Sequence, residues 1–291
     1  MATLTTAPAA ATPRRPSARR SDAGRFLWYL PALAITAVFA FPLFWIVLTA
    51  IKPRQLIPAY PPRFTFSPTW DNFRLVFDNE SYMDAIRNSL IIAVASALFS
   101  VALATLTAYG LSRHGFRAKD NLLFWILSLR MLPAIAVLIP YSQMVRWFDL
   151  SDTHLAMVLV YSVFNISFSV WLLKGFFDEI PKEMEEAAKM DGYGPWKVFT
   201  KVALPLVIPG IATALVFSVI QSMNEYLLAF VLTQRQAVTA PVALTNVFIT
   251  AFGVNYGGIS AAASVLVAPV IVFAILVRKH LIRGMSFGQL D

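Results

Sequence analysis

The sequence predicts an all-α, polytopic membrane protein with six transmembrane helices, and three observations support this prediction. The chain of 291 residues is 58% hydrophobic, only 14% of it is charged, and its uncharged stretches are as long as membrane spans. A soluble domain carries about 25% charged residues, and a helix needs about 20 residues to cross the hydrocarbon core. The shortage of charge therefore indicates a lipid environment rather than a large aqueous core.

Six segments poor in charge are long enough to cross a membrane. No residue is charged between Arg25 and Lys52, for example. Prolines inside these segments are compatible with spans, because neighbouring helices can satisfy the backbone groups that a proline frees. The expected helices lie near residues 27–50, 88–111, 122–144, 154–174, 206–231 and 258–279. We expect a membrane domain over 26–281, a disordered basic tail over 1–25 and a second tail over 282–291.

The Lys and Arg residues predict which side of the membrane each loop faces. Sixteen of the 24 lie in the N-terminal tail, the 112–121 and 174–205 loops and the C-terminal segment, and six lie in the alternate loops. Since positive loops stay cytoplasmic, both termini are expected inside a bacterial cytoplasmic (inner) membrane. This orientation explains the net charge of +8 better than nucleic-acid binding does.

Several kinds of chemistry are excluded or disfavoured by composition. The chain has no cysteine, so disulfides, thiolate metal ligands and cysteine nucleophiles are excluded. The three histidines are far apart in sequence, which disfavours a metal site. No glycine is followed by lysine, so the chain lacks the phosphate-binding loop that cradles a nucleotide. An enzyme is the least favoured class.

The loop 178–205 is the most informative segment. Pro181 suits the first turn of a helix, whose apolar face would combine Ile180 and Met184 with small alanines. Asp191-Gly192 should end this helix, because glycine takes the left-handed conformation without steric cost. A second short helix, beginning at Pro195, then leads into the fifth span. An ordinary amphipathic helix on the membrane surface would show the same periodicity.

The spacing of residues in this loop resembles that of permease subunits of bacterial ATP-binding-cassette (ABC) importers. Those proteins share Glu-Ala-Ala, three residues, Gly, nine residues, then an aliphatic residue, any residue, Leu and Pro. Valine stands here where that family more often has isoleucine, and the aspartate before the glycine also fits. The matching residues are Glu186, Ala187, Ala188, Asp191, Gly192, Val202, Leu204 and Pro205.

Shorter stretches resemble the carbohydrate-uptake branch of that family, to which maltose and glycerol-phosphate importers belong. The C-terminal sequence departs from the usual Gly-Ala-Val-Lys-Gly ending. The matching stretches are Asp71-Asn72-Phe73, Asn88-Ser89, Met131-Leu132-Pro133, Ile139-Pro140, Asn224-Glu225-Tyr226 and Arg283-Gly284.

The resemblance implies a type I ABC-importer permease fold and a set of partners. A second permease subunit, which the branch implies is a different chain, would complete the translocation path for a sugar or sugar derivative. Two ATPase subunits would bind ATP and Mg and grip the 178–205 loop, so this chain itself would carry no cofactor. An extracytoplasmic binding protein would deliver the solute, and the uncharged segment 236–257 either meets that protein or packs on the outer rim.

Polar residues inside the spans are candidates for the translocation path. A central arginine costs about 2.5–3.5 kcal/mol on insertion scales, so Arg130 should face the interior or water. It could contact substrate or pair with Glu225. Asn224 and Glu225 are further path candidates that could instead hydrogen-bond the partner subunit. Asn165 and Gln221 are weaker path candidates, because polar pairs between helices are common in bundles.

Two other functions remain open on the sequence. An ion-coupled secondary transporter favours acidic residues near mid-membrane, and of these the chain offers only Glu225. A non-transporting membrane scaffold would use the 178–205 loop as an adaptor site.

Overall fold

The computed structural model describes residues 22–250 and 253–286. The chain divides into two units, residues 1–45 and 46–291. Of the first unit, the described part is the beginning of α1 (Asp22–Ala50), an apolar helix that contains two prolines. The expected N-terminal tail over 1–25 falls mostly outside the described residues, although α1 already begins at Asp22.

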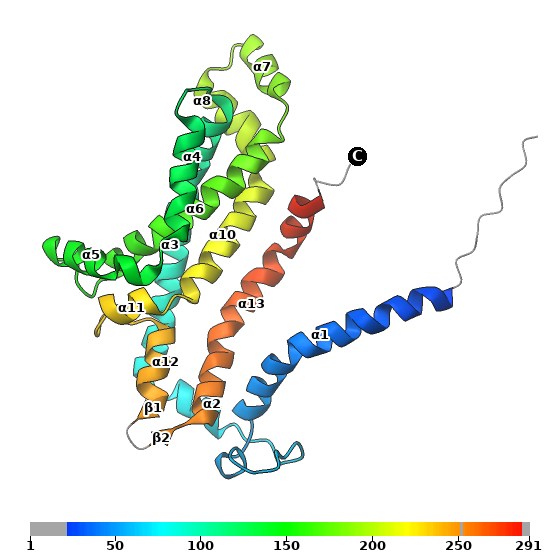
Figure 1. Ribbon diagram of the computed structural model, residues 1–291, viewed down its shortest axis with the longest axis vertical. Helices are drawn as coiled ribbons and strands as arrows, with labels where there is room; N and C mark the ends of the chain where they lie inside the picture. Colours follow the sequence, from blue (N-terminus) through cyan, green and yellow to red (C-terminus); the bar gives the residue numbers. More distant parts are fainter. Residues whose placement is uncertain (1–21, 251–252, 287–291) are drawn as a thin grey trace, which may run out of the picture. The chain divides into compact units, whose positions relative to one another are not determined.

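Four helices form the bundle at the centre of the second unit (Figure 1). The helix α3 packs against α6 and α10, and α10 also contacts α13. Alanines and serines of α3, such as Ala93 and Ser96, are fully buried. Small residues at a helix interface let two backbones approach closely. The four helices are α3 (Glu80–Arg113), α6 (His154–Asp178), α10 (Ile208–Met223) and α13 (Tyr256–Ser286).

The helices confirm the all-α polytopic class. Among the described residues, four helices are long and apolar enough to cross a membrane, and the count reaches six if each of two bent helix pairs is one span. The four are Tyr29–Ala50, Glu80–Arg113, His154–Asp178 and Tyr256–Ile275, and the bent pairs are Lys119–Met131 with Ala134–Trp147 and Pro195–Leu206 with Ile208–Met223.

The predicted third span is not one helix over 122–144. It consists of α4 (Lys119–Ser128) with the 3-10 turn η2 (Leu129–Met131), and of α5 (Ala134–Trp147), bent by 95°. Pro133 causes the break, because proline forces the preceding residue into an extended conformation, and Leu132 has a ψ of 124°.

The bounds of other helices also differ from the prediction. The fifth span ends at Met223 rather than at 231, and a separate helix α11 (Leu227–Leu232) follows. The second begins eight residues early, at Glu80, and α13 continues to Ser286 into the expected C-terminal tail. The helices α3 and α13 thus continue into charged residues beyond the apolar segments, which charge gaps cannot reveal.

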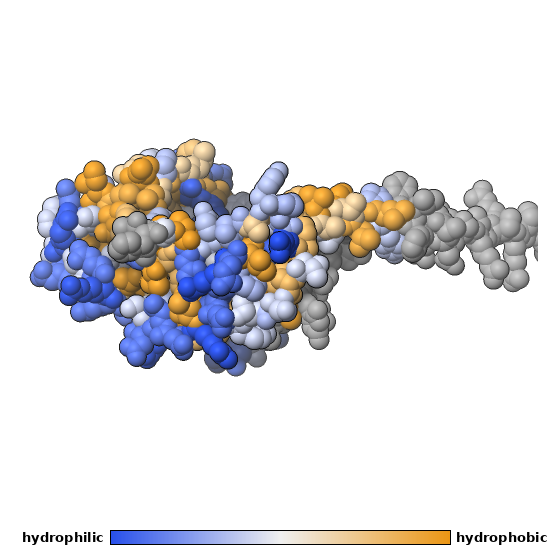
Figure 2. Space-filling view, turned by 90° about the horizontal axis from the view of Figure 1, so that it is seen from below, coloured by the Kyte–Doolittle hydropathy of each residue, from blue (hydrophilic) through white to orange (hydrophobic). Residues whose placement is uncertain are grey.

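Short elements occupy the two ends of the second unit (Figure 1). Seen from the end with α2 and the hairpin, hydrophilic residues cover much of the surface (Figure 2). One end carries α7 (Lys182–Met190), α8 (Pro195–Val198), the π-turn η3 (Phe199–Ala203) and α9 (Leu204–Leu206). The other carries η1 (Arg54–Leu56), α2 (Asp71–Phe77), α12 (Ala240–Phe248) and the antiparallel pair β1 (Ile249–Thr250) and β2 (Gly253–Val254).

Candidate functional site

The loop 178–205 forms the predicted helix–turn–helix. The helix α7 begins directly after Pro181 and ends at Met190, and Asp191 caps it before Gly192, which has a φ of +86°. Pro195 occupies the first turn of α8, where its missing N–H would have no helical partner. Two prolines and one left-handed glycine therefore determine the shape of the loop.

The predicted apolar face of α7 is only partly correct. Ile180 and Ala188 are buried, but the Met184 side chain is 46% exposed and Glu185 only 3%. The face that packs on the bundle therefore contains a carboxylate in place of the methionine. A hydrophobicity pattern misses this because a paired charge can be buried where an unpaired one cannot.

Glu185 is held by a buried ion pair with the last residue of α3. The Nε atom of Arg113 lies 2.6 Å from Oε1 of Glu185, and these side chains are only 8% and 4% exposed. Tyr109 donates a hydrogen bond of 2.9 Å to Oε2, and Nη2 of Arg113 donates to the Ile180 carbonyl at 3.2 Å. Because these partners satisfy both charges, α7 is attached to α3 as well as to its chain neighbours.

Aromatic packing reinforces this attachment. The ring of Tyr109 lies 5.4 Å from that of Phe177 in α6 and 4.8 Å from that of Phe199 in η3. Ser112 of α3 also donates a hydrogen bond of 2.6 Å to Asp178, at the end of α6. The loop therefore forms one rigid body with the ends of α3 and α6.

Most motif residues remain on the surface of this rigid body. Glu186, Ala187, Asp191, Gly192 and Pro205 are exposed, whereas Ala188 is buried and Leu204 is half-buried. The exposed acid and small residues lie on the side of α7 turned away from the bundle. They leave a shallow face that a partner protein could approach closely.

Three of the polar residues predicted inside the spans meet at one cavity. This cavity, here called the polar cavity, measures about 130 Å³. Asn165 of α6 donates a hydrogen bond of 2.9 Å to Ser222 of α10, whose hydroxyl lies 3.1 Å from that of Ser96 in α3. The cavity is lined by Ala134, Tyr161, Phe164, Asn165, Gln221, Ser222, Glu225 and Leu228.

Glu225 lies at the break between α10 and α11. Its carboxylate accepts hydrogen bonds from the Tyr161 hydroxyl at 3.1 Å and from the Leu228 and Ala229 backbone N–H groups at 3.0 and 3.2 Å. An acid at this position thus stabilises the start of α11. Because the fifth span is broken at this residue, Glu225 lines the polar cavity.

Arg130 and Asn224 lie elsewhere. Arg130 forms no ion pair with Glu225 in the described part of the chain, and its guanidinium carbon lies 4.9 Å from the centre of the Phe168 ring. Asn224 ends α10, is exposed and does not line the polar cavity. Neither position could be read from the sequence, since both depend on the breaks in the third and fifth spans.

A carboxylate that the sequence did not single out, that of Asp152, holds the segment between α11 and α12 in place. Asp152, between α5 and α6, accepts hydrogen bonds from the backbone N–H groups of residues 234–237 at 2.8 to 3.1 Å. Partial burial by itself would raise the pKa of Asp152, but these four donors outweigh it and hold the pKa below the usual 3.8. The sequence carries no signal for this role of Asp152. Its positive φ of +57° marks the position only in the folded backbone.

Replacing Asp152 by Asn should lower the free energy of unfolding by about 1–2 kcal/mol at pH 7, because charge-assisted hydrogen bonds are lost at a half-exposed site. Because the pKa of Asp152 is lower in the folded state, its ionised carboxylate stabilises the fold at pH values above the unfolded-state pKa of about 3.9. This stabilisation disappears as the pH falls through the folded-state pKa. Thermal unfolding of the detergent-purified protein should therefore show a difference at pH 7 that shrinks below pH 4. Asp149→Asn is the control, since exposed Asp149 also has a positive φ of 55°; equal effects of both variants would contradict the role of Asp152.

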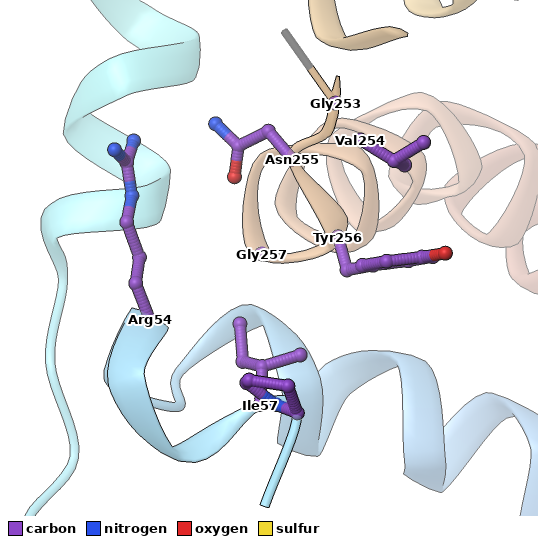
Figure 3. A pocket seen from close by; sticks show the side chains of 8 residues that line it. Arg54, Ile57, Gly253, Val254, Asn255, Tyr256 and Gly257 are labelled. Atoms are coloured by element: carbon purple, nitrogen blue, oxygen red, sulfur yellow. The ribbon is translucent and has the colours of Figure 1, made fainter.

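A second cavity, of about 450 Å³, lies at the end with α2 and the hairpin. Its walls come from η1 with the residues after it and from the turn between β2 and α13, with Arg54 and Asn255 among the lining side chains (Figure 3). The uncharged segment 236–257 thus contributes to the wall of this second cavity as well as to packing, through α12, on the bundle.

A membrane bundle with a helix–turn–helix at one end is the arrangement expected of the membrane subunit of a transporter. Comparison with known proteins identifies which transporter. Residues 100–287 match the family described as binding-protein-dependent transport system inner membrane component, and the chain belongs to this family. It is thus a permease subunit of an ABC importer.

Individual relatives cover nearly the whole chain. A probable ABC transporter permease of Sinorhizobium fredii is 34% identical over 91% of this chain and 95% of its own length. The trehalose transport system permease protein SugB of Mycobacterium tuberculosis is 32% identical over 90% and 96%. A bacterial ABC transporter that imports the acidic polysaccharide alginate has the same fold, with a TM-score of 0.74, 22% identity and coverage of 91% and 99%.

Proposed function

We propose that this chain and a second, different permease subunit form the translocation path for a sugar or sugar derivative. An extracytoplasmic binding protein delivers the solute, and two separate ATPase subunits hold ATP and Mg. The relatives named for trehalose, maltodextrin and diacetylchitobiose transport support a saccharide substrate. The Lys and Arg distribution supports cytoplasmic termini and a cytoplasmic position for α7.

The observation that carries this proposal is the rigid attachment of α7. Moving a two-state equilibrium from 1:99 to 99:1 takes about 5.5 kcal/mol of differential binding. Closure of the ATPases can deliver that free energy to the spans only through a connection that does not bend. The Arg113–Glu185 ion pair and the ring contacts of Tyr109 provide such a connection.

The coupling face would then consist of the motif residues of the loop. Glu186 and Ala187 are exposed for the ATPase, the turn at Asp191-Gly192 sets the direction of the loop, and Leu204-Pro205 joins it to α10. Ala188 packs beneath this face. In the path itself, Asn165 and Glu225 face the polar cavity, and Arg130 and Asn224 lie on the surface that a second permease could cover.

Gly192→Trp tests the docking role. A Cβ atom at Gly192 would meet no atom within 4 Å, so the bundle should still insert and fold, although the positive φ strains the turn. The bulky ring should abolish uptake in reconstituted vesicles and reduce co-purification of the ATPases at least tenfold. Gly115→Trp, also in open space and in the neighbouring loop, should retain both. Normal transport by the Gly192 variant would refute docking at this face.

A further inference from the structure

The polar cavity has the chemical character of a sugar-binding subsite. Its polar wall consists of the Asn165 and Gln221 amides, the Tyr161 hydroxyl and the Glu225 carboxylate, and its apolar wall includes the Phe164 ring. Small-molecule sites combine apolar and aromatic surface with a few polar groups that fix orientation. A sugar ring is complementary to both walls, because its C–H face packs on an aromatic ring and its hydroxyls donate and accept hydrogen bonds.

Two of the polar groups are available to a ligand. Gln221 makes no side-chain hydrogen bond to the described residues and is exposed, and Asn165 uses its Nδ2 atom for Ser222 while its Oδ1 atom has no partner among them. Glu225 is already held in place by Tyr161 and α11. The carboxylate is thus pre-positioned, and the two amides can complete the coordination of a ligand hydroxyl.

The charge of the lining selects among sugars. Glu225 is the only acid that lines the polar cavity, and no Lys, Arg or His lines it. Arg130 of η2 contacts Phe168, which lies one helical turn beyond Phe164 and Asn165 in α6, and it does not line the cavity. A uronate or a sulfonated sugar would bring a second negative charge beside Glu225 without a cation to offset it, whereas a neutral sugar would donate its hydroxyls to the carboxylate.

On these observations we infer that the polar cavity binds one ring of an uncharged saccharide during passage and discriminates against acidic sugars. The inference rests on the proposed function and adds the substrate class to it. The volume of about 130 Å³ is below the roughly 300–1,000 Å³ of complete small-molecule sites. The cavity therefore takes part of a larger ligand, and the second permease would contribute the opposite wall.

The test uses the complete importer with its binding protein in vesicles. Radiolabelled trehalose, maltose and diacetylchitobiose serve as neutral probes and digalacturonate as the acidic one. We expect uptake of at least one neutral probe and none of the acid. Gln221→Ala should lower that uptake at least tenfold, and Gln221→Asn, which keeps the uncharged amide donor and acceptor, should retain more of the uptake than the alanine variant.

Gln234→Ala is the matched control. Gln234 is exposed beyond α11 and its side chain makes no hydrogen bond to the described residues, so uptake should be unchanged. Import of digalacturonate, normal uptake by Gln221→Ala, or an active complex that imports none of the neutral probes would each overturn the subsite. Failure of the ATPases to co-purify would instead refute the proposed function, and the subsite with it.

Discussion

Glu185→Ala is expected to destabilise the protein by about 3–5 kcal/mol, because it leaves the Arg113 guanidinium buried without its counter-charge. It should also abolish uptake, since α7 would lose its attachment to α3. The free energy of unfolding can be followed by thermal unfolding in detergent, and uptake by transport in vesicles. Glu183→Ala, an exposed acid on the same helix, should change the stability by less than about 0.5 kcal/mol.

A double-mutant cycle separates the ion pair from other effects of the substitution. Replacing both Arg113 and Glu185 by Met removes both charges and keeps side-chain volume, so the double variant should be more stable than either single one. If the two single losses simply add in the double variant, the residues are not coupled and the attachment of α7 lies elsewhere. If the double variant regains stability but not uptake, the polar connection itself transmits the motion.

Gly257→Ala should cost about 3 kcal/mol, at the upper end of the effect of overpacking. A Cβ atom at Gly257 would lie 2.5 Å from Oδ1 of Asn72 and 2.8 Å from its Cγ. Asn72 cannot withdraw, because it is fully buried and its Nδ2 donates to the carbonyls of Ala50 and Lys52 at 2.9 and 3.0 Å. The substitution should therefore separate α13 from α2 and lower the unfolding temperature and the yield of folded protein.

Gly110→Ala provides the control for this experiment. Gly110 lies within α3 with no atom near an added Cβ, so alanine should be neutral or stabilise the helix by about 0.5–1 kcal/mol. Asn72→Ala in the Gly257→Ala background should remove the clash, making the double variant more stable than the two separate losses predict. A Gly257→Ala protein as stable as the wild type would show that this contact can relax.

The sequence predicted the class and the helix–turn–helix of the 178–205 loop because both depend on local information. Charge-poor stretches of span length follow from the cost of burying charge in lipid. The loop followed from Pro181, Gly192 and Pro195, whose backbone preferences act on neighbouring residues. The structure confirms the helical class and this helix–turn–helix, with α7 ending at Met190 and α8 starting at Pro195.

The sequence predicted the third and fifth spans but not where they are broken. A proline inside an apolar segment is compatible with a continuous span or with a sharp break, and packing decides between them. At Leu132-Pro133 the chain bends by 95°. The bend moves Arg130 to Phe168, away from the Glu225 that the sequence offered as its partner.

By itself, then, the sequence determined that the protein is a helical membrane protein with a helix–turn–helix between its fourth and fifth predicted spans. It could do so because apolar length and local backbone preference are properties of contiguous residues. Only the tertiary structure decided that Glu185 rather than Met184 faces the bundle, that four backbone N–H groups converge on Asp152, and that Asn165, Gln221 and Glu225 share one cavity. These pairings join residues about 50 to 85 positions apart. Which distant side chains meet depends on how whole helices pack, and no local pattern encodes that.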